Sequence, residues 1–209
     1  MLKRITIIMS IITVILCLIS CQSMQIRSEE EVNEEKDNLL LNPSFEDIKY
    51  WEQGGCVNFC RAVERSDCYD GDMAFGIKHD VSHGYDLWGV CYQVLRDPDN
   101  PDALYPVKPG DIFTFKMWVK LEKGYNGYAS LKLEFFGHDR RKGFFSGPLT
   151  LYQSDIIMGS CDWTEISVSG EAPEGTVSVV VVCVSEGMKR ECKFALFDKG
   201  SVTIKKKKH

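Results

Sequence analysis

The stretch that decides the fold reads Ile-Phe-Thr-Phe-Lys-Met-Trp-Val-Lys from Ile112 to Lys120. Successive side chains of a β-strand point to opposite faces, so this stretch has an apolar side and a polar side. The apolar side carries Phe113, Phe115, Met117 and Val119. The other side carries Thr114, Lys116, Trp118 and Lys120. We therefore expect a strand with one face in a core and a tryptophan on its outward face.

The same alternation recurs in short runs from Leu39 onward, separated by Gly, Pro, Asn and Asp, as antiparallel β structure requires. No segment has the pattern of an amphipathic helix. The fold class predicted is all-β, an antiparallel β-sandwich of jelly-roll topology. The expected strands are Met73–Lys78, Leu87–Leu95, Asp111–Leu121, Ala129–Phe136, Thr164–Ser169, Thr176–Val184 and Lys193–Ile204.

The N-terminus has the parts of an export signal. Lys3 and Arg4 precede an apolar stretch that ends in Leu-Ile-Ser before Cys21. This order resembles the lipobox of bacterial lipoproteins, which implies removal of residues 1–20 and lipidation of Cys21 with fatty-acyl chains such as palmitate. A transmembrane helix is the alternative, but the stretch is shorter than the roughly 20 residues that span a bilayer. We expect a lipid-anchored protein of the bacterial cell envelope.

The composition of residues 21–209 indicates three segments. Residues 21–37 are rich in glutamate and predict a flexible acidic tether, residues 38–204 form one domain, and residues 205–209 form a basic tail. The formal net charge is −5, and loss of Lys3 and Arg4 makes it −7. A nucleic-acid partner is therefore not expected. The tail is interpreted as solvated, with anionic lipid or cell-wall polymer as the alternative contact.

The cysteines suggest one disulfide. Cys183 and Cys192 flank a polar segment typical of a hairpin turn, so we expect them to pair. Cys56, Cys60 and Cys68 could bind zinc, but no fourth ligand completes a closed site, so disulfides or buried thiols are preferred there. The number of cysteines left after export is odd, which leaves at least one thiol unpaired.

Six motifs, in order, resemble carbohydrate-binding modules of the family 4/9 type. They include Asn38 to Glu46 with Trp51 five residues on, Gly71 to Phe75, and Val107 to Gly110 followed by Phe113 to Lys120. The others are Trp163-Thr164-Glu165, Ala172-Pro173-Glu174-Gly175 and the closing segment Phe197 to Val202. The resemblance implies a galactose-binding-like jelly roll. Departures are the extra cysteines, an acidic Pro-rich insertion at 96–106, and Lys-Gly at 199–200.

The resemblance also implies a concave sheet face on which glycan lies. Sugars stack their apolar faces on aromatic rings and bond to planar polar groups. Trp118 leaves the core face of its strand and is the first candidate platform. The predicted carbohydrate-binding set is Trp118, Trp88, Tyr92, Phe136, Tyr85, Gln93, Lys116 and Glu134, with Lys132 as a further polar contact. Alternation does not settle which face of Leu87–Leu95 is buried.

The acidic residues of one loop suggest a calcium site. Asp67, Asp70 and Asp72 crowd one loop, and Ca²⁺ prefers oxygen ligands. The family resemblance implies one structural calcium ion, here nominating Glu46, Asp72 and Asp198. A solvated acidic turn is the alternative, with Asp70-Gly71 making the bend.

Sequence signals for catalysis are weak, since no nucleophile motif, metalloprotease motif or phosphate loop occurs. The predicted function is non-catalytic glycan binding by a monomeric lipoprotein, for polysaccharide capture or surface attachment. The alternative is a module of the same fold that contacts protein or cell wall without binding sugar. An envelope polysaccharide hydrolase is a third, weaker alternative.

Overall fold

The computed structural model describes residues 38–207 except 56–59, 65, 67, 79–86, 144–145 and 189–192. The predictions for the signal, the tether and lipidation of Cys21 lie outside the described residues. The chain divides into Met1–Asn38 and Leu39–His209, and the second unit holds both sheets and the core. Within the described part of the chain, no helix has the length and apolarity needed to cross a bilayer.

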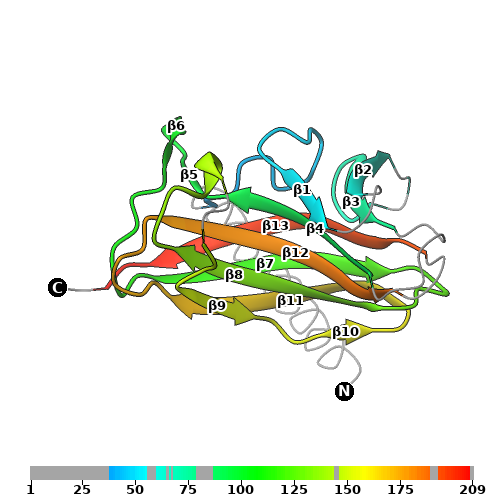
Figure 1. Ribbon diagram of the computed structural model, residues 1–209. Helices are drawn as coiled ribbons and strands as arrows, with labels where there is room; N and C mark the ends of the chain where they lie inside the picture. The colour runs from blue at the N-terminus through cyan, green and yellow to red at the C-terminus, as the bar shows by residue number, and fades with distance from the viewer. Residues whose placement is uncertain are drawn as a thin grey trace, which may run out of the picture. The chain divides into compact units, whose positions relative to one another are not determined.

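The first sheet has the strand order β1-β4-β12-β8-β10, and β9 also pairs with β8. All of these pairings are antiparallel. Figure 1 shows this sheet facing the viewer. Its strands are β1 (Glu52–Gly55), β4 (Leu87–Val94), β8 (Tyr128–Phe136), β9 (Thr150–Gln153), β10 (Ile157–Met158) and β12 (Ser178–Met188). We call it the front sheet.

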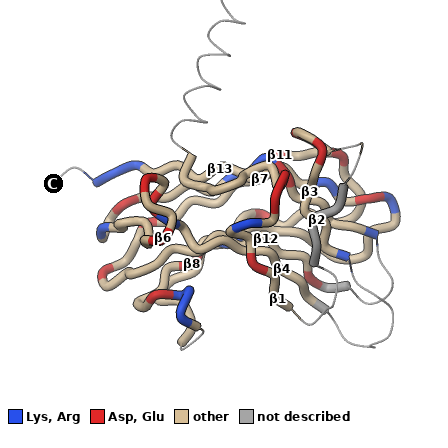
Figure 2. Tube along the Cα trace, turned by 90° about the horizontal axis from the view of Figure 1, so that it is seen from above, with Lys and Arg blue, Asp and Glu red and all other residues tan. Residues whose placement is uncertain are grey.

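The second sheet has the order β11-β7-β13-β3-β2 and is also antiparallel throughout. Its strands are β2 (Cys60–Glu64), β3 (Met73–Ile77), β7 (Ile112–Leu121), β11 (Cys161–Glu171) and β13 (Ala195–Lys205). We call it the back sheet. Figure 2 shows the two sheets as separate layers, with β13, β7 and β11 in one and β12, β4 and β8 in the other.

Two small elements complete the fold. β5 (Arg96–Asp97) and β6 (Asn100–Leu104) form a hairpin within the acidic insertion, and η1 (Arg140–Lys142) is a short 3₁₀ helix after β8. Arg141 joins them, since its side chain donates to the carbonyl of Asp102 at 2.6 Å and pairs with Asp139 at 2.9 Å. The insertion and η1 are therefore fastened together at one end of the front sheet.

The predicted fold class is confirmed, and each of the seven expected strands is present. The decisive strand behaves as its alternation predicts, because burial along β7 alternates residue by residue. Phe113, Phe115, Met117 and Val119 are fully buried between the sheets. The strands that sequence reasoning missed are short: β1, β2, β9, β10 and the β5–β6 hairpin. Such segments are too short for a period of two to stand out.

The Lys-Gly departure near the C-terminus has a structural cause. The β13–β7 register shifts between Asp198 and Ser201, and Lys199 has a φ of 43°. A Cβ atom on Gly200 would lie 2.7 Å from Met117 Cε and 2.8 Å from Leu40 Cδ1. Glycine lets the bulged strand approach these two core side chains without displacing them.

The central strand β12 is apolar on both of its faces. Val179, Val181 and Cys183 point into the main core. Val180, Val182 and Val184 are also buried, but they belong to a second apolar cluster with Val94 and Phe136. This second cluster lies on the outward face of the front sheet, where a hollow is found.

A candidate binding cleft on the front sheet

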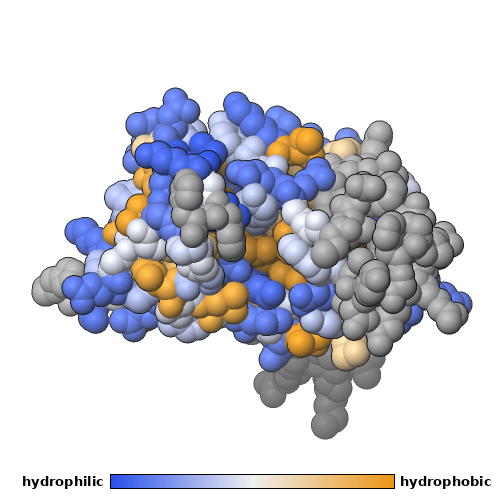
Figure 3. Space-filling view, viewed as in Figure 1, coloured by the Kyte–Doolittle hydropathy of each residue, from blue (hydrophilic) through white to orange (hydrophobic). Residues whose placement is uncertain are grey.

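A cleft of about 560 Å³ lies on the outward face of the front sheet. Figure 3 views this face and shows apolar side chains in a central hollow with hydrophilic side chains around it. The lining comes from β1, β4, β12, β8, β9 and η1 with the loop that follows it. The residues are Gly54, Trp88, Val90, Tyr92, Lys132, Glu134, Arg140, Pro148, Leu151, Val180, Val182, Val184 and Glu186.

Strand register places these residues in rows across the sheet. Val182 lies opposite Tyr92 on β4 and opposite Lys132 on β8. One row further along, Val180 lies opposite Glu134, which in turn pairs with Leu151 on β9. The valines of β12 therefore form the floor of the cleft, β4 supplies one wall, and β8 with β9 supplies the other.

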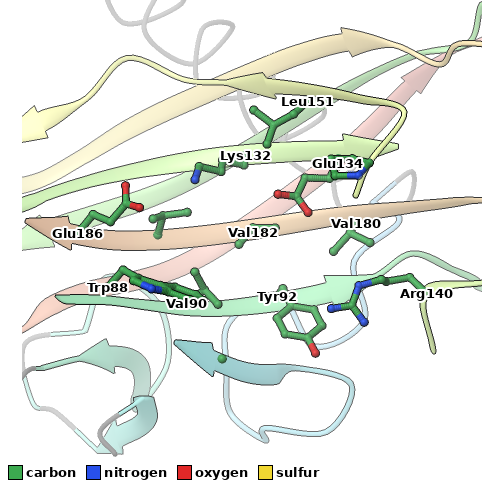
Figure 4. A pocket seen from close by; sticks show the side chains of 13 residues that line it. Trp88, Val90, Tyr92, Lys132, Glu134, Arg140, Leu151, Val180, Val182 and Glu186 are labelled. Carbon is green, nitrogen blue, oxygen red and sulfur yellow. The ribbon is translucent and has the colours of Figure 1, made fainter. Parts of the chain in front are cut away.

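The first wall bears two aromatic rings, separated along β4. Trp88 is 40% exposed, so much of its ring is open to solvent. Figure 4 shows Trp88 toward one end of the cleft, with Tyr92 and Arg140 toward the other. Trp88 is thus the aromatic side chain of the cleft that offers the largest open surface for stacking.

Tyr92 is held in place from two sides. Its hydroxyl donates a hydrogen bond to Glu52 Oε2 at 2.7 Å, and the Arg140 guanidinium lies 5.5 Å from its ring centre. Burial, with the Glu52 carboxylate as a second cause, raises the pKa of Tyr92 to about 12. Tyr92 therefore stays a neutral phenol near pH 7, with a fixed ring orientation.

The opposite wall and the two ends carry charged groups. Burial raises the pKa of the Glu134 carboxyl, and the charges of Lys132 and Arg140 partly oppose that shift. Glu186 accepts a hydrogen bond from the Tyr128 hydroxyl. The cleft thus combines an apolar floor with side chains that can both donate and accept hydrogen bonds along its walls.

The structure brings part of the predicted site together. Trp88, Tyr92, Lys132 and Glu134 all line the cleft. Trp118 and Lys116 do not, because both lie on β7 of the back sheet, facing away from the core. The predicted grouping is wrong for these two residues. Alternation showed that Trp118 leaves the core, but a sandwich has two outward faces and alternation cannot distinguish them.

Three further predicted contacts are not available in the cleft. Phe136 faces outward but is fully buried, with the Arg140 guanidinium 5.8 Å from its ring and His138 at its edge. Gln93 is fully buried on the inward face of β4, where it bonds to the backbone of Leu41. Tyr85 lies outside the described residues.

The predicted calcium ligands meet at one loop. Glu46 Oε1 accepts from the backbone N–H groups of Asp72 and Met73 at 2.9 and 3.1 Å. Asp198 Oδ2 accepts from those of Tyr69 and Asp70 at 2.9 and 3.0 Å, and Oδ1 from that of Lys199 at 2.7 Å. Burial raises the pKa of Asp198 to about 6.

Calcium at this loop stays a prediction. Asp72 meets Glu46 through its backbone N–H group, and its carboxylate, which calcium would need, is not part of that contact. No cluster of three or more His, Cys, Asp or Glu side chains suited to a metal occurs within the described ranges, which leave out Asp67. The loop is fastened by carboxylates that accept N–H groups, as in an acidic turn with Gly71 at a φ of 62°.

Of the two cysteines predicted to form a disulfide, the structure describes only Cys183. Cys183 is fully buried and carries a free thiol, directly opposite Cys91 on β4. Its expected partner, Cys192, lies outside the described residues. Of the three cysteines considered for zinc, Cys56 also lies outside them, and Cys68 is partly buried.

Sequence reasoning missed Arg140, Glu186, Leu151 and the valine floor. One signal could have found the floor: residues 179–184 read Val-Val-Val-Val-Cys-Val, with no polar position on either face. An unbroken apolar strand indicates cover or a hollow on both sides of its sheet. Arg140 reaches the cleft from a turn, and the periodicity of strands or helices does not predict the position of a turn residue.

Solved structures of other proteins share the fold of this chain. No protein-family model and no curated protein matches the sequence. Among solved structures, TmCBM61 in complex with β-1,4-galactotriose superposes with a TM-score of 0.56 at 16% identity, covering 80% of this chain and 99% of that one. The chain therefore has the β-sandwich fold of carbohydrate-binding modules.

Two other solved structures agree. The CBM22-1 xylan-binding domain of Paenibacillus barcinonensis Xyn10C matches with a TM-score of 0.52 at 14% identity, covering 79% of this chain and 93% of that one. A cyclase from Fischerella sp. TAU, in complex with 4-(1H-indol-3-yl)butan-2-one, matches with a TM-score of 0.52 at 13% identity, covering 81% and 98%. Because one sandwich serves such different ligands, function must be argued from the cleft.

Proposed function

We propose that the front-sheet cleft binds a polysaccharide or oligosaccharide chain without cleaving it. The observation that carries this proposal is the open ring of Trp88 in a hollow that also presents Lys132, Glu134 and Glu186. The indole supplies a surface for the apolar face of a sugar ring, and the charged groups supply partners for its hydroxyls. The galactotriose bound to TmCBM61 and the xylan-binding domain of the same fold support this choice.

The spacing of carboxylates supports binding without catalysis. Glu134 lies opposite Val180, and Glu186 follows six residues later on β12. At about 3.3 Å per residue, the two positions are separated by about 20 Å along the strand. Glycosidases place two carboxyl groups about 5–10 Å apart across the scissile bond. These two glutamates are therefore assigned to hydrogen bonding and not to acid–base work.

Affinity electrophoresis of residues 38–209 tests the proposal. Gels containing xylan, β-1,4-galactan or other polysaccharides should retard the protein, and Trp88→Ala should weaken that retardation about tenfold, since a stacked ring contributes about 1 kcal/mol beyond its buried area. Trp118→Ala, which removes an indole from the opposite sheet, is the matched control and should leave retardation unchanged.

The outcomes separate the alternatives. Loss of retardation in Trp118→Ala but not in Trp88→Ala would overturn the cleft assignment. Migration unaffected by every polysaccharide would favour the rival function, an interaction module that contacts protein or cell wall. Release of reducing ends from a polysaccharide by the pure protein would overturn the non-catalytic assignment.

We further propose that lipidated Cys21 holds this binding domain at the bacterial envelope, where it would capture polysaccharide or attach the cell to a glycan surface. The support is the sequence pattern around Cys21. Metabolic labelling with a radioactive or clickable palmitate analogue tests it: the full chain should incorporate label, and Cys21→Ala should not. Equal labelling of both would exclude this anchor.

A further inference from the structure

The outward face of the back sheet carries a second aromatic group, far from the cleft in the fold. Tyr69 stacks on Trp118 with ring centres 3.9 Å apart and 13° between planes. Trp163 of β11 meets Tyr69 edge-on at 6.0 Å. Tyr69 itself is 38% exposed, so the stack presents open aromatic surface to solvent. We call this group, with the lysines described next, the aromatic–lysine face.

Lysines surround these rings. Lys199 Nζ lies 5.8 Å from the ring centre of Tyr69, and Lys120 Nζ lies 5.8 Å from that of Trp163. Lys116 and Lys205 share the outward face, since Lys116 alternates with buried residues along β7 and Lys205 follows Ile204, which packs partly buried against the core. Acids are also present: Glu165 lies opposite Trp118, and Asp162 pairs with Lys120 at 3.7 Å.

This combination suits the surface of an anionic bilayer. Tryptophan and tyrosine rings favour the boundary between hydrocarbon and water, because they are apolar with one polar group. Lysine side chains can lie along such a surface and place the ammonium among phosphates. Each lysine near an anionic bilayer adds favourable binding free energy that salt weakens.

The course of the chain provides a second, independent observation. Leu39, the first residue of the folded unit, donates its N–H to the carbonyl of Val202 at 2.9 Å. Val202 lies on β13, in the middle of the back sheet. The folded unit therefore begins beside the back sheet, which bears the aromatic–lysine face. Two residues later, Leu41 is bound by Gln93 of the front sheet.

We propose that the aromatic–lysine face docks on an anionic phospholipid surface, so that the glycan cleft on the front sheet points away from the membrane. The inference rests on the proposed lipid anchor for bringing the domain to a membrane. It does not depend on which ligand occupies the cleft.

Vesicle flotation tests the face without the anchor. Residues 39–209 contain both sheets and the whole described core, so residues 38–209 are mixed at low salt with phosphatidylglycerol–phosphatidylcholine vesicles or with phosphatidylcholine vesicles alone. We expect flotation with the anionic vesicles that decreases as salt is added. The paired change Lys116→Glu and Lys199→Glu should weaken binding at least about twenty-five-fold, at about fivefold for each lysine charge removed.

Two further variants make the result specific. Glu165→Lys should strengthen flotation, because it replaces the acid opposite Trp118 by a cation. Trp88→Ala, in the cleft, should leave flotation unchanged.

Three results would overturn the docking face. They are absence of flotation with anionic vesicles, insensitivity to the lysine reversals, and a loss caused by Trp88→Ala. If the lysine reversals weakened retardation by an anionic polysaccharide and left vesicle binding unchanged, the face would be a glycan site instead. Palmitate labelling of Cys21 and retardation by glycan are read separately, so failure of docking is distinguishable from failure of the proposed function.

Discussion

The side-chain amide of Gln93 forms two hydrogen bonds with the backbone of Leu41. Gln93 Oε1 accepts from the Leu41 N–H at 2.8 Å, and Gln93 Nε2 donates to the Leu41 carbonyl at 2.8 Å. Leu41 lies outside any strand, but its backbone N–H and carbonyl are both hydrogen-bonded, as they would be in a sheet. The glutamine expected to contact sugar instead fastens the N-terminal segment to β4.

Gln93→Leu should therefore destabilise the domain. The substitution would leave the N–H and carbonyl of Leu41 without these partners, at about 1–3 kcal/mol for each buried group. Urea unfolding followed by tryptophan fluorescence measures the change in the free energy of unfolding. Gln53→Leu, at an exposed position of β1, is the matched control and should change stability by less than about 0.5 kcal/mol. Equal stability of the two variants would contradict the structural role of Gln93.

Gly200→Ala should be costly as well. Its new methyl group would lie within 3 Å of Met117 and Leu40, so the core would have to shift, at about 1–3 kcal/mol. The same substitution at Gly147 has no heavy atom within 4 Å of the added Cβ and should be nearly neutral. Thermal unfolding of both variants gives the comparison. A Gly200→Ala protein as stable as Gly147→Ala would show that the bulge of β13 is not as tightly packed as described.

The stability of the domain should decrease as the pH rises through about 6. The pKa of Asp198 is raised to about 6 by burial, while the unfolded chain returns it to the ordinary value of 3.8. The protonated form is thus favoured by folding, so this contribution is complete below about pH 4 and is lost as the carboxyl ionises. Urea midpoints across pH 4–8 should show the decline, and Asp198→Asn should flatten it. If Asp198→Asn left the dependence of stability on pH unchanged, other titrating groups would be its cause.

Calcium should not change the melting temperature measurably. The carboxylate oxygens of Glu46 and Asp198 already accept backbone N–H groups, so an ion would gain less from them than from free carboxylates. Differential scanning fluorimetry with CaCl₂ and with EDTA provides the measurement. A higher melting temperature in CaCl₂, abolished by Asp198→Asn, would contradict this expectation and restore the calcium site that the family resemblance implies.

The fold could be predicted from sequence because its signal is local. Each long strand carries its own alternation, and β7 shows it most clearly, with Phe113 to Val119 pointing inward at every second position. Burial of one face of each sheet is sufficient to require two packed layers. Solved carbohydrate-binding modules share this fold.

The site could be predicted only in part because it depends on which strands become neighbours. Trp88, Tyr92 and Glu134 meet since β4 and β8 both pair with β12, a relationship between residues far apart in the sequence. Trp118 shows the same alternation as these residues but belongs to the other layer. Arg140 comes from a 3₁₀ turn and covers Phe136. The Phe136 ring therefore points outward but is inaccessible, which the alternation along a strand cannot predict.

The valine floor of the cleft has a consequence before folding is complete. Residues 179–184 combine high β propensity, no charge and no proline, which is the composition of segments that stack into amyloid. In the native sheet both edges of β12 are occupied, by β4 on one side and β8 on the other. A chain that has not yet paired those neighbours exposes a self-associating strand, so refolding of this protein should favour dilute conditions or a chaperone that shields β12.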